Sequence, residues 1–178
     1  MIEKYLTENT YIDKIKKLND VYWNKSYKQR WAYINAIVEI LKSLNLNNIL
    51  EIGSMQICLS PQSDNLDLSF EMIDKKNLVN KIYIQDCLQV PYNITDKYYD
   101  MVVMLQVLEH LSPKQLEVFK EVKRISKNAI ISIPHLWNCP DDIEHHMITK
   151  EHFDKWTDNE KYKEEFIIKE RLIRIYNF

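Results

Sequence analysis

Glycine is nearly absent from this chain. Its 178 residues contain one glycine, Gly53. Glycine adopts positive φ angles more readily than any other residue, so the tight turns here must be built from asparagine, aspartate and proline. A glycine-rich loop that wraps a nucleotide phosphate is therefore excluded. A ligand that needs close approach of the backbone has one glycine to use.

The apolar pattern predicts helices and strands in alternation. Apolar residues at three- and four-residue steps over 26–44 form one face of an amphipathic helix, and a shorter helix precedes it near 11–18. Segment 101–105, MVVML, is apolar without alternation, as expected of a strand covered on both faces. Further strands are predicted over 49–52, 65–70, 81–85 and 129–133, with a closing antiparallel pair over 165–169 and 171–176.

Two helix starts have capping signals. Ser112–Pro113 offers a capping hydroxyl followed by proline at the first helical position, and Thr149 is a candidate cap for a short helix ending near Trp156. The predicted fold class is α/β: a Rossmann-like, doubly wound, mostly parallel sheet with N-terminal helices and an antiparallel C-terminal hairpin strand.

Composition excludes several classes of protein. The formal net charge is −2, which argues against a general binder of nucleic acid or of membrane surfaces. No apolar run approaches the roughly 20 residues of a membrane span, and the N-terminus lacks the pattern of a signal peptide. The three cysteines have no metal-binding spacing and fit a reducing compartment, so we expect a cytoplasmic protein.

Polar residues follow the predicted strands where a doubly wound sheet binds its ligands. Gly53 ends the first strand, and Asp67, at the second, can accept hydrogen bonds from two ribose hydroxyls. Asp74 competes for that role, because it lies at the spacing of about 20 residues expected after a full helix. We favour Asp67, since Pro61 and its polar neighbours predict a loop. Asp86, after the third strand, can accept from an adenine amine or cap a helix.

Four segments together resemble class I S-adenosylmethionine-dependent methyltransferases. The stretch 98–111, YYDMVVMLQVLEHL, is similar to the fourth-strand motif of that family. Segment 85–92, QDCLQVPY, and segment 48–54, NILEIGS, resemble its third-strand and first-strand motifs. Segment 121–134 resembles the following helix and fifth strand. The tail is more loosely similar to small methyltransferases of bacterial surface-glycan and secondary-metabolism gene sets.

The resemblance implies S-adenosylmethionine as the cofactor and assigns residues to its parts. Around the methionine part it implies Glu51, Gly53, Ser54 and Gln106; at the ribose, Asp67 with Leu68; at the adenine, Asp86 with Cys87. The first motif departs from the family, because Met55 and Ile57 stand where a second and third glycine are usual. This departure leaves open a degenerate module that binds or scaffolds without turnover.

The acceptor side offers two histidine-based interpretations. His110 follows the fourth strand and is a candidate general base, with Glu109 beside it, because histidine titrates near neutral pH. Two metal-dependent branches of the family carry E-x-x-E-H here, whereas this chain has an amide at Gln106. A divalent metal held by Glu109, His110 and either His145 or His146 is the less favoured interpretation.

The remaining candidates would bind the acceptor. They are the aromatic and polar residues of the N-terminal segment and of the loop after the fifth strand: Tyr27, Arg30, His135, Trp137, His145 and His146. Arg30 suits a phosphate or carboxylate. The predicted function is methylation, on oxygen rather than nitrogen, of a small polar acceptor such as a sugar or metabolite, with RNA as a second option.

The predicted organisation is a single methyltransferase domain over 1–178. Within it, 1–46 forms N-terminal helices, 47–134 the cofactor-binding core, and 135–178 the acceptor loop and C-terminal hairpin. We expect a small-molecule partner, no membrane partner, and a monomer or homodimer.

Overall fold

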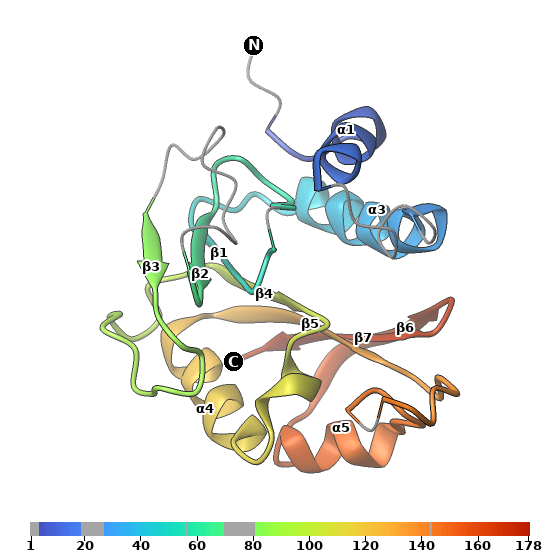
Figure 1. The fold of residues 1–178 in the computed structure, drawn as a ribbon. Coiled ribbons are helices and arrows are strands. Elements are labelled where there is room, and N and C mark those ends of the chain that lie inside the picture. The colour runs from blue at the N-terminus through green and yellow to red at the C-terminus, as the bar shows by residue number, and fades with distance from the viewer. Residues whose placement is uncertain (1–3, 19–26, 56, 70–80, 143) are drawn as a thin grey trace.

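We describe a computed structural model of the chain, which defines residues 4–18, 27–55, 57–69, 81–142 and 144–178. Its centre is a seven-stranded sheet in the order β3-β2-β1-β4-β5-β7-β6 (Figure 1). The strands are β1 (Ile49–Ile52), β2 (Asp64–Asp67), β3 (Ile82–Ile84), β4 (Met101–Leu105), β5 (Asn128–Pro134), β6 (Tyr162–Ile168) and β7 (Arg171–Asn177).

The strand pairing confirms the predicted α/β class. Strands β1 to β5 run parallel, β7 pairs antiparallel with β5, and β6 closes the hairpin with β7. The strand order reverses between β1 and β4, which lie side by side at the middle of the sheet. In open α/β sheets this reversal point is where ligands bind, at the carboxyl ends of the strands.

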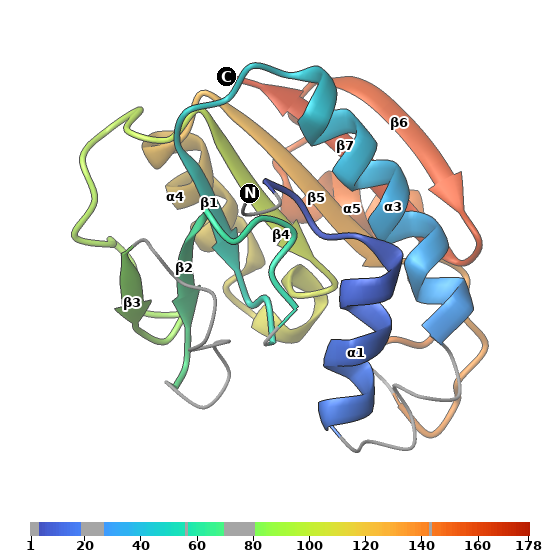
Figure 2. The same ribbon diagram turned by 90° about the horizontal axis from the view of Figure 1, so that it is seen from above.

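Helices cover both faces of the sheet (Figure 2). Helices α1 (Glu8–Leu18) and α3 (Tyr27–Ser43) lie on one face, and α4 (Gln115–Ile125) and α5 (Lys150–Trp156) lie on the other. Strand β4 serves both cores: Val102 and Met104 pack toward α4, whereas Met101 and Val103 pack toward α3. This double burial explains why β4 is apolar at every position.

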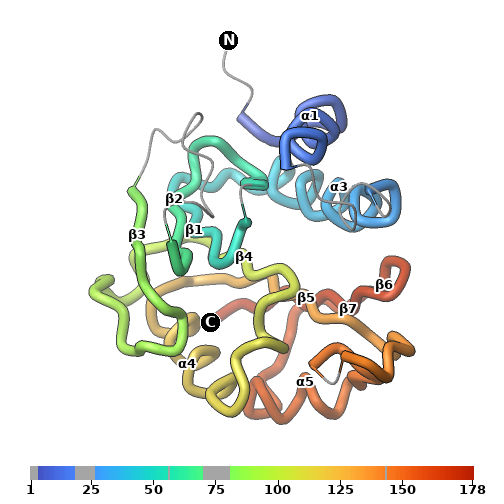
Figure 3. The backbone as a smooth tube through the Cα atoms, viewed as in Figure 1, coloured from blue at the N-terminus to red at the C-terminus, as the bar shows by residue number. Residues whose placement is uncertain are grey.

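Two described connections on the β3 side of the sheet are irregular. The residues described between β1 and β2 form no helix, as Pro61 and its polar neighbours predicted. The connection from β3 to β4 is an irregular loop, which Figure 3 traces. Among the described residues, no helix combines the length and apolar character that a membrane crossing requires.

One predicted helix start was wrong. Ser112 ends a short 3₁₀ helix, η2 (Leu108–Leu111), and α4 begins at Gln115 with Lys114 at its N-cap position. Ser112 and Pro113 form an exposed turn between η2 and α4, so the helix begins two residues later than the capping pattern predicted. Thr149 does precede α5, where its backbone N–H donates to His152 Nδ1 at 3.1 Å.

Candidate active site

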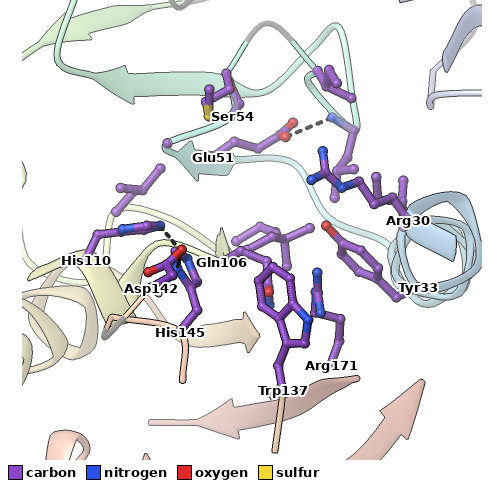
Figure 4. A pocket seen from close by; sticks show the side chains of 18 residues that line it. Arg30, Tyr33, Glu51, Ser54, Gln106, His110, Trp137, Asp142, His145 and Arg171 are labelled. Carbon is purple, nitrogen blue, oxygen red and sulfur yellow. Dashed lines mark hydrogen bonds and ion pairs between the residues drawn. The ribbon is translucent and has the colours of Figure 1, made fainter. Parts of the chain in front are cut away.

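A cavity of about 470 Å³ opens at the carboxyl ends of β1 and β4. Figure 4 shows His110 and His145 at one end, Arg30 and Arg171 at the other, and Gln106 between them. The cavity therefore lies at the reversal of strand order, where the fold predicts a ligand.

The single glycine sits where a side chain would clash with Val107. Gly53 has a φ of +69°, and its backbone N–H donates to the Leu66 carbonyl at 2.9 Å. A Cβ at this position would lie 2.6 Å from Val107 Cγ2. The turn after β1 thus packs directly on the segment after β4, and it brings backbone to the cavity wall.

Glu51 anchors the loop that replaces a helix between β1 and β2. Its carboxylate accepts hydrogen bonds from the backbone N–H groups of Leu59 (2.8 Å) and Ser60 (3.0 Å), and from the Ser63 hydroxyl. Burial raises the pKa of this carboxyl above its ordinary value. Glu51 lines the cavity, but its oxygens are turned toward the loop.

Gln106 occupies a strained position beside the turn. Its φ is +55°, uncommon for a residue with a side chain. The strain is held by two contacts with β5: the Gln106 N–H donates to the Ser132 carbonyl at 3.0 Å, and Nε2 donates to Ser132 Oγ at 2.9 Å. Met55, with a φ of +46°, faces the same cavity. Such strain concentrates at functional sites.

The predicted nucleoside residues lie at the ends of β2 and β3, outside the wall of this cavity. Asp67 is buried and accepts from the backbone N–H groups of Leu68 (2.9 Å) and Met55 (3.4 Å). Asp86 accepts from the Leu88 N–H at 2.9 Å, so it caps a turn and not the helix of the alternative interpretation. Burial, with Asp67 and Asp86 nearby, raises the pKa of the Cys87 thiol to about 12. Leu68 is exposed, and the alternative Asp74 lies outside the described residues.

The two histidines at the other end face each other through their Nε2 atoms. His110 Nε2 and His145 Nε2 lie 3.1 Å apart. His110 Nδ1 is 2.8 Å from Glu144 Oε2, and His145 Nδ1 is 2.7 Å from Asp142 Oδ2. These contacts assign a proton to each Nδ1, because carboxylates only accept. The two Nε2 atoms then need a proton or a cation between them.

Glu109 lies beneath this pair, away from the cavity. The residue is 2% exposed, and among the described residues neither carboxylate oxygen has a hydrogen-bond partner. Burial raises the pKa of Glu109 to about 8. Its Oε1 lies 4.0 Å from His145 Nε2, and ligand atoms of Glu109, His110 and His145 lie within 4.8 Å of one another.

The acceptor candidates divide into two groups. Arg30, Trp137 and His145 line the cavity. The others do not: Tyr27 packs against the core beneath α3, His135 is half-buried after β5, and His146 is exposed and accepts from the Cys139 N–H.

Three polar lining residues were missed: Tyr33, Asp142 and Arg171. Tyr33 lies one helical turn after Arg30 in α3, so helical spacing could have indicated it. Arg171 pairs with Pro134, the last residue of β5. Because β7 is antiparallel, its first residue returns to the carboxyl edge of the sheet, a signal that was present in the predicted hairpin.

Comparison with known proteins supports one family. Residues 53–130 match the family described as a methyltransferase domain. The chain contains a class I S-adenosylmethionine-dependent methyltransferase domain. No curated protein matches this methyltransferase.

Several solved structures share its fold. The PH0226 protein of Pyrococcus horikoshii OT3 is 15% identical over 85% of this chain and 90% of its own, with a TM-score of 0.65. The methyltransferase domain of bacterial CtHen1-CN is 15% identical over 84% and 100%, with a TM-score of 0.64. A SAM-dependent methyltransferase of Aquifex aeolicus is 16% identical over 92% and 96%, with a TM-score of 0.57.

The methyltransferase has side chains and space that fit S-adenosylmethionine. Met55 and Ile57 line the cavity without filling it, and about 470 Å³ remains, within the 300–1,000 Å³ typical of small-molecule sites. Carboxylates at the next two strand ends, Asp67 and Asp86, are acceptors of the kind that ribose hydroxyls and an adenine amine require. The acceptor set thus suits the nucleoside end of the cofactor.

Proposed function

We propose that this methyltransferase methylates a hydroxyl oxygen of a small polar acceptor, such as a sugar or another metabolite. The observation that carries the proposal is the pair of His110 and His145 on the cavity wall, each held through Nδ1 by a carboxylate. A hydroxyl must lose its proton as the new bond forms, and imidazole is suited to receive it near neutral pH.

The residues proposed for the cofactor lie at four strand ends: Glu51, Gly53, Ser54 and Gln106 at the methionine part, Asp67 and Leu68 at the ribose, and Asp86 and Cys87 at the adenine. When bound, S-adenosylmethionine supplies an electrophilic methyl group and is released as S-adenosylhomocysteine. The protein's part is to hold the acceptor oxygen in line and to exclude water.

The histidine pair is arranged to take up one proton. With both Nδ1 atoms donating to carboxylates, the two Nε2 lone pairs face each other at 3.1 Å, which is repulsive. A proton taken from the acceptor hydroxyl would relieve this repulsion by forming a hydrogen bond between His110 and His145. Glu109 acts through His145 as a positioning residue, because it is buried beneath that ring.

A small acceptor fits the dimensions of the site. The cavity of about 470 Å³ has to accommodate the methionine end of the cofactor as well as the acceptor. Side chains of α3 and of the loop after β5 form part of the cavity wall. RNA is the less favoured acceptor, because the formal net charge is −2.

The test is calorimetry with S-adenosylhomocysteine. We expect micromolar binding by the wild-type chain, weakened by Asp67→Asn and unchanged by Asp158→Asn, which replaces an exposed aspartate in the turn after α5. If only Asp74→Asn weakens binding, the ribose assignment to Asp67 is wrong. No binding at millimolar ligand would favour the degenerate module and overturn the proposal.

A divalent cation is the second candidate, after a proton, to bind between the Nε2 atoms of His110 and His145. Two imidazoles and a buried carboxylate with unpartnered oxygens, all within 4.8 Å, form a plausible ligand set for a transition metal. The cation would take the place of the shared proton and polarise the acceptor hydroxyl.

Manganese titration followed by electron paramagnetic resonance tests this second candidate. Metal-dependent chemistry predicts binding that His145→Asn abolishes and that His146→Asn, a change at the neighbouring exposed histidine, leaves intact. Methyl transfer that continues at full rate after thorough chelation would remove the cation from the mechanism and leave the proton interpretation.

A further inference from the structure

The end of the cavity opposite the histidines carries two guanidinium groups. Arg30 comes from α3 and Arg171 from the start of β7, and both line the cavity (Figure 4). A smaller hollow of about 90 Å³ borders the same two arginines and is also lined by Lys169 and Glu170. Three cationic side chains and one acidic side chain thus meet here, in a protein whose formal net charge is −2.

Aromatic rings hold the Arg171 guanidinium in place. Its Cζ lies 5.5 Å from the Trp137 ring centroid and 5.9 Å from that of Tyr33. Contacts of this kind engage the faces of the guanidinium and leave its N–H edge for hydrogen bonds. Arg171 is therefore positioned by its neighbours before any ligand arrives.

The N–H groups of Arg171 are incompletely used. Nη1 donates to the Glu170 carbonyl at 3.0 Å, whereas Nε is buried and has no acceptor among the described residues. No carboxylate within the described part of the chain lies within 4.0 Å of this guanidinium. A buried donor without an acceptor is costly, so a bound anion would remove a penalty as well as add an attraction.

The position of Arg171 favours the acceptor over the cofactor. In the sheet order, β7 is three strands away from β1, which is roughly 14 Å at a strand spacing of about 4.8 Å. The proposed cofactor residues follow β1, β2, β3 and β4. Arg171 instead contacts Trp137, in the loop after β5.

We propose that the acceptor carries a carboxylate or a phosphate, and that Arg171 binds this anionic group with Arg30 on the same wall. The inference rests on the proposed function, because it takes the histidine pair as the place of the acceptor hydroxyl. The acceptor class is then a hydroxy acid or a phosphorylated alcohol, which lies across the cavity with its hydroxyl at one end and its anion at the other.

Ligand-detected and protein-detected NMR titrations at constant ionic strength test this proposal. One arm compares 3-hydroxybenzoate with neutral 3-hydroxybenzamide, and the other compares glycerol 3-phosphate with glycerol. We expect at least one anion to bind at millimolar concentration and its neutral partner to bind at least tenfold more weakly. The arm that responds distinguishes a carboxylate from a phosphate.

Variants locate the binding. Arg171→Gln is expected to weaken the anion about tenfold or more, and Arg171→Lys, which keeps the charge but loses the planar fork, about threefold. Lys163→Gln, the same change of charge at an exposed site on β6, should leave it unchanged. Arg171→Lys keeps the test valid should the glutamine variant not fold. Failure of both anions to bind, or equal binding to wild type and Arg171→Lys, would overturn the proposal.

A competition step separates this inference from the proposed function. We expect the anion to remain bound when S-adenosylhomocysteine is added to saturation. Displacement of the anion would overturn the inference, because the arginines would then serve the cofactor's own carboxylate. If S-adenosylhomocysteine does not bind at all, the proposed function fails, while anion binding to Arg171 is still measured in its absence.

Discussion

The two halves of the sheet are built differently. On the β4-β5-β7 side, helices α4 and α5 cover one face, and the cavity wall consists of side chains that hydrogen bonds and ring contacts orient. On the β1-β2-β3 side, the described residues between β1 and β2 and those between β3 and β4 form irregular loops, and Glu51 holds the first of these loops with three hydrogen bonds. The proposed chemistry lies in the first half, and the proposed nucleoside contacts lie in the second.

This contrast indicates how a chain with one glycine retains the fold. The first half depends on apolar packing, which needs no glycine. In the second half, Gly53 adopts a positive φ and forms the turn after β1. The buried Glu51 anchors the loop between β1 and β2, where the fold often has a helix. Loss of a histidine should therefore affect turnover, whereas loss of Glu51 or Gly53 should affect stability.

The largest effect is expected in the first half. His145→Ala should lower kcat roughly 100- to 10,000-fold, because it removes half of the proton-accepting pair. S-adenosylhomocysteine affinity should stay within about twofold of wild type. Methyl transfer to an acceptor found by the anion titrations measures the rate, with His146→Ala as the control. Equal rates for His145→Ala and wild type would contradict the role of the pair.

Glu51→Ala should destabilise the second half strongly. It leaves the backbone N–H groups of Leu59 and Ser60 without their acceptor, which costs about 4 kcal/mol in the free energy of unfolding, whereas the Ser63 hydroxyl keeps the Ser60 carbonyl at 2.7 Å. Urea denaturation measures this cost. Glu39→Ala, at an exposed helix position paired with Lys42, should change stability by less than about 0.5 kcal/mol. Similar losses in both variants would show that the loop does not depend on Glu51.

Gly53→Ala tests the contact between the halves. A methyl group at 2.6 Å from Val107 Cγ2, on a backbone with φ +69°, should cost about 3 kcal/mol. Val107→Ala in the same chain should recover the part of that loss that comes from the clash. A double-mutant cycle that showed no coupling would mean that the two halves do not meet as described.

Substitutions of two aspartates at strand ends test which residues contact the ribose and the adenine. Asp67→Asn should weaken S-adenosylhomocysteine roughly tenfold, and Asp86→Asn less, because Asp86 also serves its own turn. Calorimetry on both variants shows which of them loses more affinity for S-adenosylhomocysteine. A larger loss at Asp86 would reverse the relative weight of ribose and adenine contacts.

The smallest effect concerns pH and the start of β4. The Lys127 ammonium and the N–H groups of Asn47 and Asn48 hold the pKa of Asp100 below its usual range. The ionised form is thus favoured in the folded state, so its contribution is present above about pH 4 and is lost as pH falls through the lowered pKa. Asp100→Asn should cost under about 1 kcal/mol at pH 7, and the difference from wild type should shrink in acid. A constant difference would contradict this assignment.

The sequence allowed the fold to be predicted because packing leaves a pattern. MVVML indicated a strand buried on both faces, and the hairpin, the sheet class and the loop between β1 and β2 followed from the same kind of evidence. Capping chemistry was less informative, as the wrong helix start at Ser112 shows. Local preferences are weak where a buried segment dictates the backbone.

The site was only partly predictable. Gly53, Gln106 and His110 could be assigned to the cavity because each follows a strand. The burial of Glu109 beneath His145, and the contacts of Arg171 with Trp137 and Tyr33, join segments far apart in the sequence. Long-range contacts of this kind leave no periodic signal, so they require the three-dimensional structure.

A crystal structure with S-adenosylhomocysteine tests the central claim most directly. The account predicts the ribose at Asp67 and the sulfur facing Gln106 and His110, with the space between sulfur and Arg171 left open for an acceptor. A ligand absent from the cavity after co-crystallisation at saturating concentration, or bound with its sulfur away from the histidine pair, would contradict it.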